Sequence, residues 1–299
     1  MPGTKSTSSR SAKGARREAP AADDAKPADA RTLRERYEDV RARVAAAAVR
    51  SGRRAEDVLL VAVTKYAEIE DIRELVQLGH LDLGENRVQQ LEQRAQMIDE
   101  FNQRRRDRGA GEVPDVRWHM IGTLQRNKVK KALPLVRLVH SVDSLRLAEE
   151  LQEHAEERNR ALGDDAPPVD VLVEVNVAGE KSKHGVAPAA ARHLVDMIDT
   201  MLALRPRGLM CMAPNTGSLD DARRVFTRCK EIFDEIRALR SDIAGDRFDI
   251  LSMGMSGDYE VAIECGSNLV RVGSAIFGEP AEGAEAAEGE GDETDASTH

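Results

Sequence analysis

The chain has 299 residues and a formal net charge of −9 at pH 7. This length allows one large α/β domain or two small ones and is enough to bury a sizeable core. The last 21 residues hold six Glu, two Asp and no Lys or Arg, while the first 30 hold six basic and four acidic residues; residues 31–278 are therefore nearly neutral, which argues against a nucleic-acid-binding protein with a basic face.

Cysteine usage and hydropathy indicate a cytoplasmic protein. The three cysteines, Cys211, Cys229 and Cys265, are far apart, and no CxxC pair or Cys/His cluster predicts a zinc site or a disulfide framework. The chain lacks a run of 18 apolar residues, and its basic N-terminus lacks the apolar core of a signal peptide. We therefore expect no metal and no membrane association.

Both ends of the chain are predicted to be disordered. Residues 1–30 contain no large apolar side chain after Met1, and residues 279–299 are acidic and self-repelling. Neither segment can bury enough apolar surface to offset the entropy of ordering. We interpret the acidic tail as solubilising, with a partner-binding tail as the alternative, and expect one domain over residues 31–278.

The elements between the tails alternate between strand and helix. A leading helix is expected at 32–49. Eight strands follow, at 58–64, 80–84, 116–122, 137–142, 169–176, 207–212, 248–253 and 268–273, separated by amphipathic helices at 69–77, 87–104, 125–132, 145–162, 188–202, 220–239 and 259–265. This alternation is typical of parallel strands with crossover helices, and eight such units in this length predict a (β/α)8 TIM barrel. A doubly wound sheet is the alternative, but no GxGxxG follows the first strand. The charged segment 103–115 is expected to be a surface loop.

In a barrel of this kind the chemistry lies where strands pass into helices. The first strand contains six apolar residues, Val58 to Val63, and is followed by Thr64 and Lys65. Lys65 is either a surface lysine beyond a strand end or a buried amine whose pKa is lowered, so that it can form a Schiff base with a carbonyl compound.

The last two strand ends resemble phosphate sites. "GMSGDYE" (254–260) places glycines around Ser256, and "VGSAIFG" (272–278) offers a second Gly-Ser pair one strand later. Small residues let backbone N–H groups approach an anion, and barrels often bind phosphate after strands seven and eight. A phosphate and an aldehyde on one ligand describe pyridoxal 5′-phosphate (PLP), or a sugar-phosphate aldolase intermediate.

Arg271 lies inside the eighth strand. By alternation it shares a face with Leu269 and Gly273, opposite Val270 and Val272. It is either a structural arginine paired with a carboxylate or a cation beside the pyridine nitrogen of PLP, which it would keep unprotonated.

Six blocks of the sequence resemble the pyridoxal phosphate homeostasis proteins. They are "AVTK" (62–65), "LGENRVQQ" (83–90), "WHMIGTLQRNK" (118–128), "EVNVAGEKSKHG" (174–185), "GLMCMAP" (208–214) and "LSMGMSGDYEVAIECGSNLVRVGSAIFG" (251–278). They occur in the family's order and cover about residues 32–278. Ser274 stands where many members have threonine. The tails and segment 103–115 are not family features.

The resemblance implies a single barrel similar to the N-terminal domain of alanine racemase, the fold type III arrangement. It implies that Lys65 carries PLP as an internal aldimine and that Asn86 lies near the cofactor. It also implies that Ser256, Gly257, Gly273 and Ser274 hold the phosphate and that Arg271 faces the pyridine nitrogen. The family is regarded as non-catalytic, so the resemblance implies a PLP-binding protein of PLP homeostasis that delivers PLP to apoenzymes or buffers it.

A PLP-dependent amino-acid racemase is the alternative function. Racemases with this barrel use a tyrosine from a second domain as the other base. The tyrosines here are Tyr37, Tyr66 and Tyr259, none of which lies in an additional domain. Without that domain's dimer surface we expect a monomer. A Schiff-base aldolase is disfavoured, because aldolases lack the six sequence blocks quoted above.

Several other residues are given structural roles. His119 and His140 are interpreted as filling of the barrel, and Trp118 as outer packing. The segment with Lys181, Lys183 and His184 is either a solvated loop or a lid.

Overall fold

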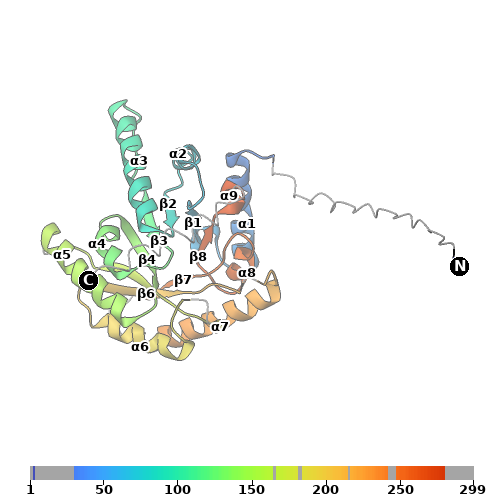
Figure 1. The fold of residues 1–299 in the computed structure, drawn as a ribbon, viewed down its shortest axis with the longest axis vertical. Helices are drawn as coiled ribbons and strands as arrows, with labels where there is room; N and C mark the ends of the chain where they lie inside the picture. The colour runs from blue at the N-terminus through green and yellow to red at the C-terminus, as the bar shows by residue number, and fades with distance from the viewer. Residues whose placement is uncertain are drawn as a thin grey trace. The chain divides into compact units, whose positions relative to one another are not determined.

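A computed structural model describes residues 3, 30–163, 166–180, 184–214, 216–241 and 247–279. The predicted barrel is confirmed: the strands form a closed barrel in the order β1 to β8, and every adjacent pair is parallel (Figure 1). The two predicted tails lie outside the described residues, apart from Gly3, Ala30 and Glu279.

Each predicted strand corresponds to a strand of the barrel. The strands are β1 (Leu59–Val63), β2 (Asp82–Glu85), β3 (Arg117–Met120), β4 (Val136–Val142), β5 (Val169–Glu174), β6 (Leu204–Met210), β7 (Ile250–Ser252) and β8 (Leu269–Val272). Their apolar, β-branched sequences suit strands that are covered on both faces.

Helices follow the strands and surround the barrel. They are α1 (Leu33–Arg50), α2 (Ile69–Gln77), α3 (Val88–Asp107), α4 (Val129–Ala132), α5 (Leu145–Leu162), α6 (Pro188–Asp199), α7 (Leu219–Leu239), α8 (Tyr259–Glu264) and α9 (Ser274–Phe277), with 3-10 turns η1 (Ala55–Asp57) and η2 (Arg126–Lys128). The leading helix α1 begins at a capping box, in which Thr32 Oγ1 accepts from Glu35 N at 3.3 Å and the Glu35 carboxylate accepts from Thr32 N at 2.8 Å. Among the described residues, none of these helices is both long and apolar enough to cross a membrane.

The structure corrects three expectations about the elements. Strand β6 begins at Leu204, not at residue 207, because Arg205 and Arg207 pair with the buried Asp170 on β5. Helix α3 continues to Asp107, so the first part of segment 103–115 is helical and not loop. The sequence analysis also missed the short helix α9, which is only four residues long.

The core has two layers. Most apolar side chains pack between the strands and the surrounding helices, whereas a smaller cluster fills the barrel interior: Val61, Leu138, Leu172, Met210 and Leu269. The alternation predicted for β8 is confirmed, since Leu269 belongs to the inner cluster and Val270 and Val272 to the outer one. Arg271 therefore points into the barrel, where it is 3% exposed.

Helix α1 fastens the two ends of the barrel sequence together. Strand β1 pairs with β8, and α1 lies beside α9 (Figure 1). Arg36 of α1 donates to the carbonyl oxygen of Ile276 in α9 at 2.8 Å. The α1 side chains Arg43 and Arg50 also form ion pairs with Glu260 of α8.

Candidate functional site

All seven residues predicted to bind a cofactor line one pocket of about 510 Å³ at the carboxyl ends of the strands. They are Lys65, Asn86, Ser256, Gly257, Arg271, Gly273 and Ser274. The same walls include Glu174, Tyr66, Met255 and Phe277. This volume is typical of a small-ligand site. Residues more than 200 positions apart in the chain therefore converge because the barrel closes between β8 and β1.

Lys65 lies just beyond the end of β1, after Thr64, as predicted. The residue is partly exposed, between the surface lysine and the buried amine that the sequence left as alternatives. The amine lies 4.4 Å from the centroid of the Tyr66 ring. Arg94 of α3 fixes the backbone here by donating to the carbonyl oxygens of Lys65 at 3.2 Å and Ala67 at 3.1 Å. The side chain of Arg94 thus fixes the loop that carries the Lys65 amine.

A buried carboxylate supports this arrangement. Glu85, at the end of β2, is fully buried and bonded by the Arg94 guanidinium and the Thr64 hydroxyl. Burial raises the pKa of Glu85, although Arg94 and Thr64 oppose that shift. The sequence analysis missed both Glu85 and Arg94 as supporting residues. A glutamate at the end of a four-residue strand gives no sign in the sequence that it is buried.

A close approach between two loops fixes Asn86. A Cβ added to Gly122 would lie 2.3 Å from the carbonyl oxygen of Asn86, so only glycine fits there. The side-chain oxygen of Asn86 is buried and has no hydrogen-bond partner among the described residues. Buried amide oxygens normally have partners, so this atom is suited to receive a donor from a ligand.

The small residues after β7 and β8 form a cradle of backbone donors. The Gly273 and Ala275 N–H groups both donate to Ser256 Oγ, at 3.1 and 3.3 Å. A Cβ at Gly257 would have no atom within 4 Å, so the backbone there is open to a ligand. The preceding turn is fixed by the Met255 N–H, which donates to Asp258 Oδ1 at 2.6 Å. The two N–H groups converge on one oxygen atom, which is the arrangement of donors that suits an anion such as a phosphate group.

Arg271 forms the floor of the pocket. Its Nη1 donates to Ser252 Oγ at 2.5 Å, and its Nη2 donates to the Cys211 carbonyl oxygen at 3.2 Å. Burial lowers the pKa of Arg271. The pocket also contains Glu174, which is 3% exposed. Burial and, next, the Asp143 carboxylate raise the pKa of Glu174. The sequence analysis missed Glu174, although it ends β5 at the same end of the barrel as the other pocket residues.

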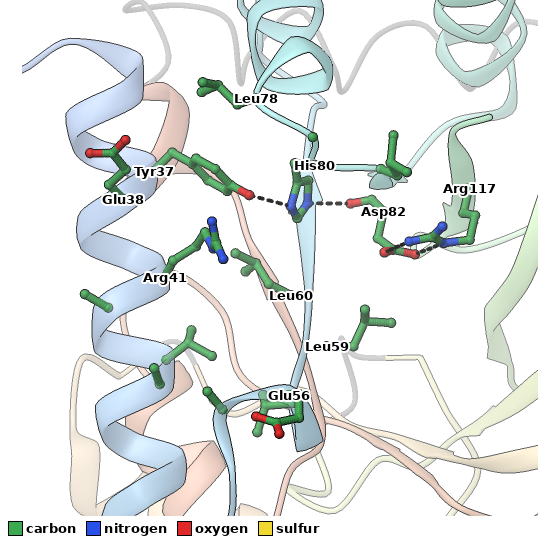
Figure 2. A pocket seen from close by; sticks show the side chains of 17 residues that line it. Tyr37, Glu38, Arg41, Glu56, Leu59, Leu60, Leu78, His80, Asp82 and Arg117 are labelled. Atoms are coloured by element: carbon green, nitrogen blue, oxygen red, sulfur yellow. Dashed lines mark hydrogen bonds and ion pairs between the residues drawn. The ribbon is translucent and has the colours of Figure 1, made fainter. Parts of the chain in front are cut away.

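A second pocket of about 720 Å³ lies at the opposite end of the barrel (Figure 2). Within it the Tyr37 hydroxyl lies 3.2 Å from His80 Nδ1, and His80 Nε2 donates to the Asp82 carbonyl oxygen at 3.0 Å. Burial lowers the pKa of His80 to about 4, so the imidazole is neutral and accepts from Tyr37. This contact joins α1 to the start of β2. None of the predicted site residues lies in this pocket.

The other residues singled out from the sequence are also placed. Trp118 belongs to the outer core layer, while His119 and His140 are buried inside the barrel, as predicted. Lys181 and Lys183 lie outside the described residues. His184 is exposed, with its Nδ1 3.7 Å from Asp143 Oδ2.

The fold agrees with the relatives of the chain. Residues 43–280 match the family "Alanine racemase, N-terminal domain". The pyridoxal phosphate homeostasis protein of Aquifex aeolicus is 36% identical over 82% of this chain and 97% of its own length. This chain therefore belongs to the alanine racemase N-terminal domain family and, within it, to the pyridoxal phosphate homeostasis proteins.

The solved structures that share the fold include two that are more than 25% identical to this chain. A protein of unknown function from Bifidobacterium adolescentis is 36% identical, with a TM-score of 0.71 over 82% of this chain and 94% of its own. PipY of Synechococcus elongatus, solved with PLP bound, is 28% identical, with a TM-score of 0.66 over 83% of this chain and all of its own.

Proposed function

We propose that this chain binds pyridoxal 5′-phosphate at the barrel mouth and acts in PLP homeostasis without catalytic turnover. The observation that carries the proposal is a single pocket that combines an amine, a cradle of backbone donors and a buried guanidinium. The PLP bound to PipY and the shared family with homeostasis proteins support it.

Each pocket residue has a role in this proposal. Lys65 Nζ would hold PLP covalently, and Ser256, Gly257, Gly273 and Ser274 would bind its phosphate. PLP supplies an aldehyde that captures amines and a ring that withdraws electrons. Arg271 is a permanent donor that would face the ring nitrogen and keep it unprotonated. An unprotonated ring withdraws electrons weakly, which favours holding PLP over turning over amino acids.

The unpaired oxygen of Asn86 would lie near the cofactor. Release of PLP to apoenzymes is part of the proposal, and Met255, which is 41% exposed at the pocket edge, offers an apolar contact for such a partner. We also infer a monomer that works in the cytoplasm.

One observation favours a second function, an amino-acid racemase. Glu174 places a carboxyl group with a raised pKa in the same pocket as Lys65, and two acid–base groups are what racemisation requires. The experiment must therefore measure turnover as well as binding.

An absorption titration with PLP tests the proposal. We expect a band near about 420 nm, typical of PLP joined to a lysine, and an adduct that borohydride reduces onto Lys65. Lys65→Ala should lose both, whereas Lys128→Ala, a lysine of η2 that does not line the pocket, should keep both. Chiral chromatography with single amino acids should detect no enantiomer conversion. Steady conversion would establish the racemase, and a reducible adduct in Lys65→Ala would refute the role of Lys65.

A further inference from the structure

A continuous chain of hydrogen bonds crosses the barrel interior from the end opposite the pocket to Arg271. Asp82 Oδ1 lies 3.2 Å from His119 Nε2, and His119 Nδ1 lies 3.0 Å from His140 Nε2. His140 Nδ1 lies 3.1 Å from Ser252 Oγ, which accepts from Arg271 Nη1 at 2.5 Å. All five residues are at most 5% exposed. They come from five strands, β2, β3, β4, β7 and β8, so only the closed barrel assembles the chain.

The protons of this chain can be assigned from its Asp82 end. Arg117 donates to both oxygens of Asp82, at 2.8 and 2.5 Å (Figure 2). Burial alone would raise the pKa of Asp82, but the hydrogen bonds from His119 and Arg117 outweigh burial and hold it well below its usual range. Asp82 is therefore ionised and can only accept, so His119 Nε2 carries a proton.

The protons of His119 and His140 can be placed on the ring nitrogens in two ways. Burial holds the pKa of His140 well below its usual value, with His119 and Arg271 adding to the shift, so His140 carries one proton. If that proton were on Nδ1, His119 would have to donate from both nitrogens as a cation. Arg117 already balances the charge of Asp82, and Arg271 lies at the other end, so a further buried cation is unfavourable. The proton of His140 is therefore on Nε2.

The remaining donors follow from this assignment. His140 Nδ1 accepts from the Ser252 hydroxyl, whose lone pairs then face Arg271 and accept from its Nη1. Every donor in the chain, from Arg271 to His119, thus points toward Asp82.

We propose that Asp82, His119, His140 and Ser252 are positioning residues for Arg271, with the buried charge of Asp82 ordering their protons across the barrel. Ser252 and the Cys211 carbonyl then anchor one nitrogen each of the guanidinium, and its other N–H groups stay available to the pocket. The consequence for PLP rests on the proposed function, in which Arg271 faces the ring nitrogen. A residue at the end of the barrel opposite the cofactor pocket would thus set the geometry of Arg271 in that pocket.

The tautomers of the two histidines test the proton assignment without any cofactor. Two-dimensional ¹H–¹⁵N spectra of the isolated protein should show His119 and His140 protonated on Nε2 alone. Asp82→Asn, which removes the charge but keeps the shape, should change the tautomers of both. Asp170→Asn is the matched control, because Asp170 is equally buried at the same end of the barrel and pairs with Arg205 and Arg207. It should leave both tautomers unchanged.

A His140 proton on Nδ1 in the unsubstituted protein, or unchanged tautomers in Asp82→Asn, would overturn the proposal.

PLP titration tests the consequence for the pocket. We expect Asp82→Asn and Ser252→Ala to weaken PLP binding on the order of tenfold, the worth of one hydrogen bond to a charged group, and to shift the absorption band. Asp170→Asn should lose comparable stability in urea but bind PLP normally. Equal loss of affinity in all three variants would show a general effect of stability and refute positioning. If the unsubstituted protein bound no PLP, the proposed function would fail, while the tautomer result would still stand.

Discussion

Replacing Arg94 with methionine isolates the support behind Lys65. The change keeps the length of the side chain but removes the cation that faces the fully buried carboxylate of Glu85. Leaving one partner of a buried ion pair uncompensated costs about 3–5 kcal/mol. The two carbonyl oxygens bonded by Arg94 lose their donor as well. We therefore expect Arg94→Met to lower the free energy of unfolding by about 4 kcal/mol at pH 7.

The pH dependence of this loss has a defined sign. The pKa of Glu85 is already raised in the folded protein, so its ionisation destabilises the fold as pH rises above the unfolded value of 4.5. Without Arg94 that penalty grows. The difference between Arg94→Met and the unsubstituted protein should therefore be larger at pH 7 than at pH 5.

Urea unfolding, followed by circular dichroism, measures both effects. Adding Glu85→Gln to Arg94→Met removes the stranded charge and should restore about 2 kcal/mol at pH 7. If Arg94→Met cost less than about 1 kcal/mol, as an exposed pair would, or if Glu85→Gln destabilised it further, the reasoning about a buried pair would be refuted.

Two further predictions concern other contacts. The pKa of His80 is about 4 in the folded protein and about 6.5 in the unfolded chain, so the unfolded chain takes up a proton first as pH falls. The protein should therefore lose about 3 kcal/mol of stability between pH 6.5 and pH 4 in urea titrations, and His80→Gln should not show this loss. Equal losses in both proteins would contradict this. Gly122→Ala should cost about 3 kcal/mol or more in thermal unfolding, since its Cβ would meet the backbone of Asn86, whereas Gly257→Ala should unfold normally because its Cβ meets open space. Unaltered stability in Gly122→Ala would show that the two loops can move apart.

The architecture and the pocket residues were largely predictable from the sequence, for a shared physical reason. Strands covered on both faces produce short apolar runs, so their ends could be located, and a barrel brings those ends to one face. Lys65 and Ser256 could be placed at the same mouth on this basis. The start of β6 was predicted three residues late, because its first residues include Arg205 and Arg207, and their pairing with the distant Asp170 cannot be seen in the local sequence.

The supporting polar groups were not predictable. Glu85 and Asp82 are charged residues of a short strand, and nothing in their neighbourhood distinguishes buried from exposed carboxylates. Their burial depends on partners from other strands and helices, Arg94 and Arg117. For the same reason His119 could be recognised as barrel filling, but its place in a directed chain depended on register across five strands.

The contact between α1 and α9, beside the pairing of β1 with β8, affects the order in which the protein folds during its synthesis. Lys65 emerges from the ribosome early, whereas the cradle at Gly273 and Ser274 is synthesised about 200 residues later, and contacts this distant in sequence form late and slowly. The pocket can therefore exist only after the final strand has docked against the first. A ligand that contacts residues after both β1 and β8 would bind the complete barrel and not the partly folded chain. The concentration of free cofactor would therefore influence how much of the newly made chain stays folded.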